Sequence, residues 1–490
     1  MIRKVLPFIL ILFAVAIQAQ KYTTPNTGVN WTILDLNNAN APVYPKGTGF
    51  AIWDSIEVSE LDTITLHPGD FIELDSAVTI TVFGTFLSLG AEDNEVTITS
   101  VDSLKPYNGF RFEEGANAVF DYSIVKNGGG FKVIAENLTI TNCQFLNNVR
   151  GLGSAAVLDL SYGAPLIQNN RFILNVRPAV SSPANRAVAA KIINNYFYGN
   201  NQQNDNRPQI NMGTTGSDTL IIAGNTIIGD RKLDRVGGIA VANLTGNANG
   251  INTIIQDNTI IDNRYGMNIQ GGNAYALIKN NIIEDNDTEG KPLLGGSGIS
   301  LNSGAPTQDI TIIGNEMRRN LWGITIINQA SANLGDDDTP GNNIFADNGN
   351  EGVIYALYNN TAHTITAKSN CWIEGKESTL EEAGSVIFDV ADDEKLGEVI
   401  YDPILCGETV NTVDVEHNIA IYPNPAYDRI FLSGIQEFRQ LGIYSLEGKQ
   451  LLLTKIDAHT TSVPFNLHSG MYILELQNDS NKVSRKLVVE

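Results

Sequence analysis

The chain has little cysteine, histidine or positive charge. Its 490 residues include three Cys and five His, with no CxxC or HxxxH spacing, so a thiolate or imidazole metal site is not indicated. Lys and Arg total 32 against 54 Asp and Glu, for a net charge of −22. Such a surface repels polyanions, which excludes nucleic acid as a partner. Binding of an acidic polysaccharide would need a local basic groove or bridging Ca²⁺.

Long apolar runs are equally scarce, and one lies at the N-terminus. Arg3 and Lys4 precede an apolar core from Val5 to Ile17. The small residue Ala19 follows, so residues 1–19 are expected to be a signal peptide cleaved between Ala19 and Gln20. The core is too short to cross a membrane, and no other run of 18 apolar residues occurs. We therefore expect an exported mature protein without a transmembrane segment.

The chain also lacks the Ala, Leu, Glu and Lys runs of amphipathic helices. It carries instead an irregular repeat of an aliphatic pair, an Asn, an apolar residue two places on, and an Asn or Asp three places later. Steps between anchors run from 23 to 34 residues, a period typical of stacked supersecondary units. The copies are Asn170/Phe172/Asn175, Asn195/Phe197/Asn200, Asn225/Ile227/Asp230, Asn258/Ile260/Asn263, Asn281/Ile283/Asn286, Asn315/Met317/Asn320 and Asn343/Phe345/Asn348.

Each repeat consists of short β-branched runs such as Thr253–Ile255, separated by Asn or Gly. A strand this short pairs with its equivalent one repeat away, at about 4.8 Å, so the chain is predicted to coil into a parallel β-helix. Asn tolerates the left-handed φ of a sharp turn, and stacked Asn side chains can form a hydrogen-bonded ladder. The anchor Asn residues should therefore share one column, and the apolar residues after them should point inward.

These anchors resemble those of right-handed parallel β-helix proteins of the pectate-lyase-like superfamily. The opening segment Thr65–Gly69 and the closing segment Tyr401–Leu405 also resemble this superfamily. The resemblance implies an all-β fold with a right-handed β-helix and closing cap over residues 55–405, preceded by an N-terminal cap at 20–54. It specifies a fold and leaves the chemistry open, because function resides in sites grafted on folds.

The last seventy residues differ from the repeat. Longer alternating strands, such as Met471–Leu476, predict a small antiparallel β-sandwich. The motifs Ile421–Ala426, Ile443–Lys449 and Ser469–Ile473 resemble the type A C-terminal sorting domain of the type IX secretion system. This resemblance implies a linker at 406–417 and a sorting domain at 418–490. It also implies the type IX machinery as a partner, and a product that is secreted or attached to the outer cell surface.

Export into an oxidising compartment bears on the cysteines. Cys371 and Cys406 flank the closing cap and are predicted to form a disulfide. Cys143 occupies an anchor position, where a small buried thiol is expected. Carboxylates of the kind that bind Ca²⁺ occur at 336–338, but three adjacent Asp on an extended strand cannot all face one ion. An acidic surface turn is predicted there, so no metal site or cofactor is assigned.

No catalytic constellation can be located by motif. The polar insertion at 229–235 supplies the local positive cluster Arg231, Lys232 and Arg235 on an acidic coil. Solvated loop charge is the ordinary interpretation, and a ligand-binding site for polysaccharide is the functional one. Two classes of function follow. The chain is predicted to bind polysaccharide or act as a surface adhesion or structural protein, and the alternative is a polysaccharide lyase or glycoside hydrolase.

Overall fold

The chain divides into two compact units, Met1–Glu408 and Thr409–Glu490. The predicted signal peptide, the Ala19–Gln20 cleavage site and linker residues 407–417 lie outside the described residues. The computed structural model describes residues 21–406 and 420–489, except for 150, 152–154, 247, 249, 290–295 and 351 in the first range and 423–424, 434, 436–437, 446–448, 458–459, 461 and 479–481 in the second.

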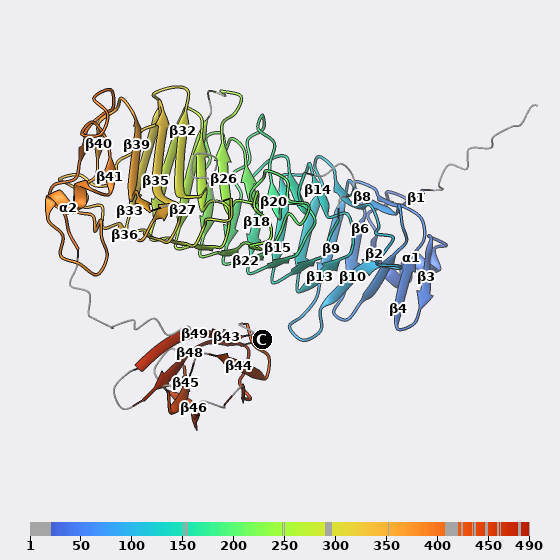
Figure 1. Ribbon diagram of the computed structural model, residues 1–490. Coiled ribbons are helices and arrows are strands. Elements are labelled where there is room, and N and C mark those ends of the chain that lie inside the picture. Colours follow the sequence, from blue (N-terminus) through green and yellow to red (C-terminus); the bar gives the residue numbers. More distant parts are fainter. Residues whose placement is uncertain are drawn as a thin grey trace, which may run out of the picture. The chain divides into compact units, whose positions relative to one another are not determined.

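The described part of the first unit is built from three long sheets, called A, B and C, whose strands succeed one another along the stack (Figure 1). Sheet A has fourteen strands: β1 (Tyr22–Thr23), β5 (Ile56–Val58), β8 (Thr79–Val82), β11 (Gly109–Phe112), β14 (Phe131–Val133), β17 (Leu158–Leu160), β20 (Val180–Ser181), β23 (Ile210–Met212), β26 (Ile239–Ala242), β29 (Met267–Gln270), β32 (Ser297–Ser303), β35 (Trp322–Asn328), β39 (Leu357–Thr361) and β41 (Ile387–Phe388).

Sheet B has eleven strands: β2 (Asn30–Thr32), β6 (Thr63–Leu66), β9 (Thr85–Leu89), β12 (Asn117–Asp121), β15 (Asn137–Thr141), β18 (Leu166–Gln168), β21 (Lys191–Ile193), β24 (Leu220–Ala223), β27 (Ile251–Gln256), β30 (Ala274–Lys279) and β33 (Gln308–Ile313). Sheet C has thirteen: β3 (Val43–Lys46), β4 (Gly49–Ile52), β7 (Phe71–Leu74), β10 (Val96–Ser100), β13 (Ser123–Lys126), β16 (Gln144–Leu146), β19 (Arg171–Ile173), β22 (Tyr196–Tyr198), β25 (Thr226–Ile228), β28 (Thr259–Ile261), β31 (Ile282–Glu284), β34 (Glu316–Arg318) and β36 (Ile344–Ala346).

One turn of chain visits the sheets in the order A, B, C, as in β17, β18 and β19, and then returns to A at β20. Every strand in these sheets pairs in parallel with its equivalent one coil away, except for the β3–β4 hairpin. The predicted parallel β-helix is confirmed.

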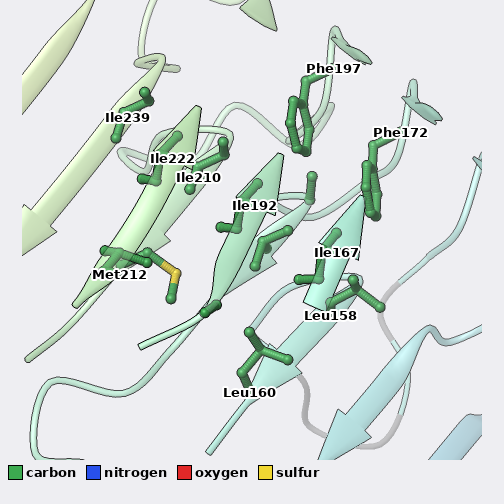
Figure 2. Packing of buried hydrophobic residues seen from close by; sticks show 14 of the residues in the cluster. Leu158, Leu160, Ile167, Phe172, Ile192, Phe197, Ile210, Met212, Ile222 and Ile239 are labelled. Carbon is green, nitrogen blue, oxygen red and sulfur yellow. The ribbon is translucent and has the colours of Figure 1, made fainter. Parts of the chain in front are cut away.

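The interior of the coil is filled by alternate residues from all three sheets, which converge in the close-up of Figure 2. In sheet C the apolar anchors lie in register and are at most 1% exposed, as predicted: Phe172, Phe197, Ile227, Ile260, Ile283, Met317 and Phe345. The ring of Phe172 stacks on Phe145 at 4.9 Å and on Phe197 at 5.0 Å. Each such side chain contributes about 1.5–3 kcal/mol by burial.

The anchor Asn residues form one hydrogen-bonded ladder at the turn from sheet B to sheet C, which confirms the predicted column. The backbone N–H and the Nδ2 of Asn225 both donate to Oδ1 of Asn258, each at 2.9 Å. The same pair of bonds joins each rung to the next along Asn170, Asn195, Asn225, Asn258, Asn281, Asn315, Asn343 and Asn370.

The backbone at these turns differs in one detail from the expectation. The left-handed φ was predicted for the anchor Asn, and it falls on the residue before it. Asn169 has φ 57°, Asn194 54° and Gly224 66°. The anchor itself is therefore free to keep its amide buried while its neighbour makes the bend.

The N-terminal end is closed by helix α1 (Ile33–Asn38), which buries Ile33 and Leu36 against the first coils. The segment predicted as a cap, residues 20–54, also supplies the first strands of all three sheets, within its described part 21–54. The Asp62 carboxylate is 1% exposed and accepts the backbone N–H groups of residues 26–29 at 2.8, 2.9, 2.9 and 3.1 Å. Burial raises the pKa of Asp62, but hydrogen bonds to its ionised form outweigh this and hold the pKa below its usual value.

The C-terminal end of the coil is covered by α2 (Leu380–Gly384), which buries Ala383, and by the short pair β40 (Ile365–Thr366) and β42 (Val399–Ile400). A disulfide joins Cys371 to Cys406, with the Cα atoms 4.3 Å apart. The strands β37 (Gly349–Asn350) and β38 (Val353–Ile354) pair antiparallel.

The second unit is a small antiparallel β-fold, as predicted. A three-stranded sheet contains β43 (Ala420–Tyr422), β44 (Arg429–Ser433) and β47 (Ser462–Pro464). A four-stranded sheet contains β46 (Gln450–Lys455), β45 (Gln440–Tyr444), β48 (Gly470–Gln477) and β49 (Lys482–Val489). Ile430 from the first sheet and Ile443 and Leu474 from the second share one buried core.

Candidate functional site

The outer face of sheet A carries a row of mostly uncharged polar side chains. Strand pairing aligns Ser181, Asn211, Ala240, Asn268, Ser300, Thr325 and Tyr358 in one register row. A second row, two residues along each strand, contains Ala242, Gln270, Asn302, Ile327 and Asn360. Inward neighbours such as Met267 and Ile269 are fully buried, so strand alternation alone turns these residues outward.

These rows form the floor of a groove of about 900 Å³, here called the sheet A groove. One wall comes from the loops that enter the sheet, with Asn206, Arg207, Arg264 and Tyr265. The opposite wall includes Leu244, which is 63% exposed. Seven strands from β20 to β39 span the floor, and six steps of about 4.8 Å give it a length of about 29 Å.

Few charged side chains line the groove, and most of them are matched. Lys132 Nζ lies 2.9 Å from Asp159 Oδ2, and the backbone N–H of Ala155 donates to the same oxygen at 3.0 Å. Arg264 Nε lies 3.3 Å from Glu289 Oε2, and its guanidinium also donates to Asn206. Asp159 is the carboxylate among the described lining residues.

The far end of the floor is aromatic. Trp322, Tyr355, Tyr358 and Phe388 form an aromatic cluster in which Trp322 and Tyr358 stack at 4.5 Å and Tyr358 and Phe388 at 4.6 Å. Burial raises the pKa of Tyr358, helped by the charge of Asp393. Tyr265 in the wall lies close over Gly237, where an added Cβ would approach the ring to 2.2 Å, and burial raises the pKa of its hydroxyl to about 12. The tyrosine hydroxyls therefore stay neutral across physiological pH.

Gln209 fixes the groove wall to the core. A second Asn column follows sheet C, and its repeat position in one coil is Asp230, whose carboxylate cannot donate a hydrogen bond. Gln209, fully buried, takes that rung instead: its Oε1 accepts from Asn200 Nδ2 at 2.9 Å, and its Nε2 donates to Asn263 Oδ1 at 3.0 Å. The wall loop at 206–208 is thereby held one residue away from an interior anchor.

The predicted ligand-binding residues lie on the neighbouring loop after β25, and the described lining of the groove comes from other residues. Arg231 Nη1 donates to Asp262 and its Nη2 to Asp287, each at 2.7 Å, and the bond to Asp262 is the main cause of its raised pKa. Lys232 and Arg235 are exposed. The positive cluster is thus a partly neutralised loop outside the groove.

The acidic turn at 336–338 is organised by its own hydrogen bonds. Asp336 accepts from Asn333 Nδ2 at 2.6 Å and from the backbone of Asp338 and Thr339, which lowers its pKa. Within the described residues, no group of three or more His, Cys, Asp and Glu side chains is placed to hold a metal ion. Among those same residues, no helix is long and apolar enough to cross a membrane.

The comparisons with known proteins concern the two units separately. Residues 420–490 match the family model described as a secretion system C-terminal sorting domain. A comparison with curated proteins finds no match. Similar solved structures include the periplasmic alginate epimerase AlgG, at 12% identity and TM-score 0.37, and a point mutant of it, at 12% and 0.40. Each match covers 76% of this chain and 83% of that one. At this identity the likeness concerns the fold alone.

The chain is therefore a parallel β-helix protein that carries a type IX C-terminal sorting domain. That domain directs export, so the protein is secreted or attached to the outer cell surface, and the type IX secretion machinery is its partner.

Proposed function

We propose that the exported β-helix binds extracellular polysaccharide along the sheet A groove. The observation that carries the proposal is the composition of the floor: side-chain amides and hydroxyls over about 29 Å, ending at an aromatic cluster. Amides donate and accept at once, as sugar hydroxyls require, and the aromatic cluster adds apolar surface for the C–H groups of a sugar. A groove with a floor about 29 Å long suits a chain rather than a compact ligand.

The floor is also rigid. Asn268 and Ser300 stand on adjacent strands whose inward neighbours are fully buried, and the wall is anchored by Gln209. A preformed surface loses little conformational entropy on binding, which favours retention of a flexible glycan. This supports a binding or adhesive role at the cell surface.

The test is affinity electrophoresis of the purified protein through a panel of soluble polysaccharides. Tyr358→Ala and Asn268→Ala should each weaken retention about five- to tenfold or more, because each removes a contact on the floor. Tyr275→Ala is the matched control, since this tyrosine is 59% exposed on β30 of sheet B. It should retain the glycan like the parent protein.

Other results would redirect the proposal. Loss of retention in Arg231→Ala with normal Tyr358→Ala behaviour would place the site on the charged loop. An increase in reducing ends would indicate a hydrolase, and an increase in the absorbance of unsaturated uronides would indicate a lyase, if Asp159→Asn abolished the increase. No retention by any polysaccharide in the panel would refute binding altogether.

A further inference from the structure

We infer that the polysaccharide held by the sheet A groove is neutral, an inference that rests on the proposed function. Between Ser181 and Tyr358 both rows of the floor consist of Ser, Asn, Ala, Gln, Thr, Ile and Tyr, without a charged side chain. This is unusual for a chain of net charge −22. The charged residues that line the groove, Lys132, Asp159, Arg207 and Arg264, lie outside these two rows of the floor.

Three of the four described charged residues that line the groove, Lys132, Asp159 and Arg264, form ion pairs within the protein. Lys132 is paired with Asp159 at 2.9 Å, beyond the Ser181 end of the uncharged floor. Arg264, 8% exposed, is paired with Glu289. Neither pair presents a net charge to a ligand, and breaking a part-buried pair to bind a carboxylate would leave the other partner uncompensated.

Arg207 is the remaining cation in the described lining, and it is exposed on the wall. A polyuronate carries a carboxylate on every sugar along the floor. One exposed arginine cannot pair with a row of carboxylates over about 29 Å. A carboxylate that packs against amides without a cation loses its hydration, and no ion pair compensates for that loss. The overall negative field of the protein opposes a polyanion further.

A neutral chain meets none of these costs and finds suitable partners. The side-chain amides of Asn211, Asn268 and Gln270 are half-exposed, and within the described residues they make no side-chain hydrogen bond. Each offers donors and an acceptor to hydroxyl groups. The stacked rings of Trp322, Tyr358 and Phe388 end the floor with apolar surface, although both faces of Tyr358 are covered by its neighbours.

The decisive experiment compares neutral probes (laminarin, xylan and galactomannan) with polyuronate probes (alginate and polygalacturonate) by isothermal titration at 50 and 500 mM NaCl. We expect a neutral probe to bind with less than a twofold change between the salt concentrations, and the polyuronates to bind at least tenfold more weakly. Tyr358→Ala should weaken the neutral complex about tenfold, and Tyr275→Ala, on β30 of sheet B outside the groove, should leave it within twofold.

The outcomes separate the two proposals. Tighter binding of a polyuronate, weakened by salt and by Arg207→Gln, would overturn the neutral assignment and leave the groove as the binding site. Neutral binding unaffected by Tyr358→Ala would overturn the assignment to this groove. Failure of every probe in both classes would overturn polysaccharide binding itself.

Discussion

Replacing one interior rung of the Asn ladder tests what holds the coil together. The substitution Asn258→Ala removes a side chain with five hydrogen bonds. Its Oδ1 accepts from the backbone N–H and the Nδ2 of Asn225. Its Nδ2 donates to Ile222 O, Gln256 O and Asn281 Oδ1. Asn258 is 1% exposed, so water does not replace these bonds.

The size of the effect follows from the count of bonds. The side chain makes five hydrogen bonds, but its two N–H groups share three acceptors, so we count about four full bonds. At about 1 kcal/mol net for each, their loss costs about 4 kcal/mol. The backbone N–H of Asn225 loses its acceptor in the interior, which adds about 1 kcal/mol or more. We expect the β-helix to lose about 4–5 kcal/mol of unfolding free energy, at the upper end of single substitutions.

Urea unfolding followed by circular dichroism measures this loss, with an unchanged m-value as evidence that the transition is the same. Hydrogen exchange of the Asn225 amide gives a local reading, because that amide should exchange faster. Asn252→Ala is the control: its Nδ2 makes a 2.9 Å bond to Thr219 Oγ1 at a half-exposed site, and its loss should cost below about 1 kcal/mol. Equal effects of the two substitutions, or unchanged exchange at Asn225, would refute the ladder as a source of stability.

Four further outcomes are expected. Burial raises the pKa of the Cys143 thiol to about 12, so it should resist Ellman's reagent in the native protein and react after unfolding; rapid native reaction would contradict its burial. Replacing Cys371 and Cys406 by Ser should lower stability by about 4 kcal/mol, from the entropy of a loop with sequence separation 35, in unfolding measured without reductant. The Asp62 pKa is lowered in the folded state, so its stabilisation is present above the unfolded value and is lost as pH falls through the folded one. Unfolding at pH 2–6 should show a shallower acid slope in Asp62→Asn, and equal slopes would contradict this. Deleting 418–490 should leave the protein in the periplasm, as read by cell fractionation, and normal surface appearance would refute the sorting role.

The parallel β-helix could be predicted from the sequence because the residues that determine it are local and repeated. Asn258 and Ile260 sit at fixed offsets in every copy, so their column and inward direction could be predicted without coordinates. The role of Gln209, which takes the ladder position expected of Asp230, could not be predicted in this way. The glutamine lies 21 residues upstream of Asp230, in a loop without a repeat. A ladder position occupied by a residue that cannot donate was the available signal.

The groove was harder to see for a similar reason. Asn268 and Gln270 look like any other Asn and Gln in a chain rich in amides, and only strand register places them beside Ser300 and Asn302. The local positive charge led to Arg231 being predicted as a ligand-binding residue instead, but in the structure Arg231 forms ion pairs with Asp262 and Asp287. Polar residues alternating with fully buried Met267, Ile269, Ile299 and Leu301 were the pattern that could have identified the floor.

The ladder makes each coil an interchangeable unit of length. Each rung bonds to the Asn Oδ1 of the next coil and to a backbone carbonyl and the equivalent Asn of the preceding coil. Asn258 does so with Asn281, Ile222 and Asn225. A duplicated segment 258–280 would supply these partners, and would insert one more strand into every sheet. The floor would then grow by about 4.8 Å without a new side chain having to be fitted. Proteins of this design can change the length of the sheet A groove by gene duplication in whole coils, while the two caps and the sorting domain stay as they are.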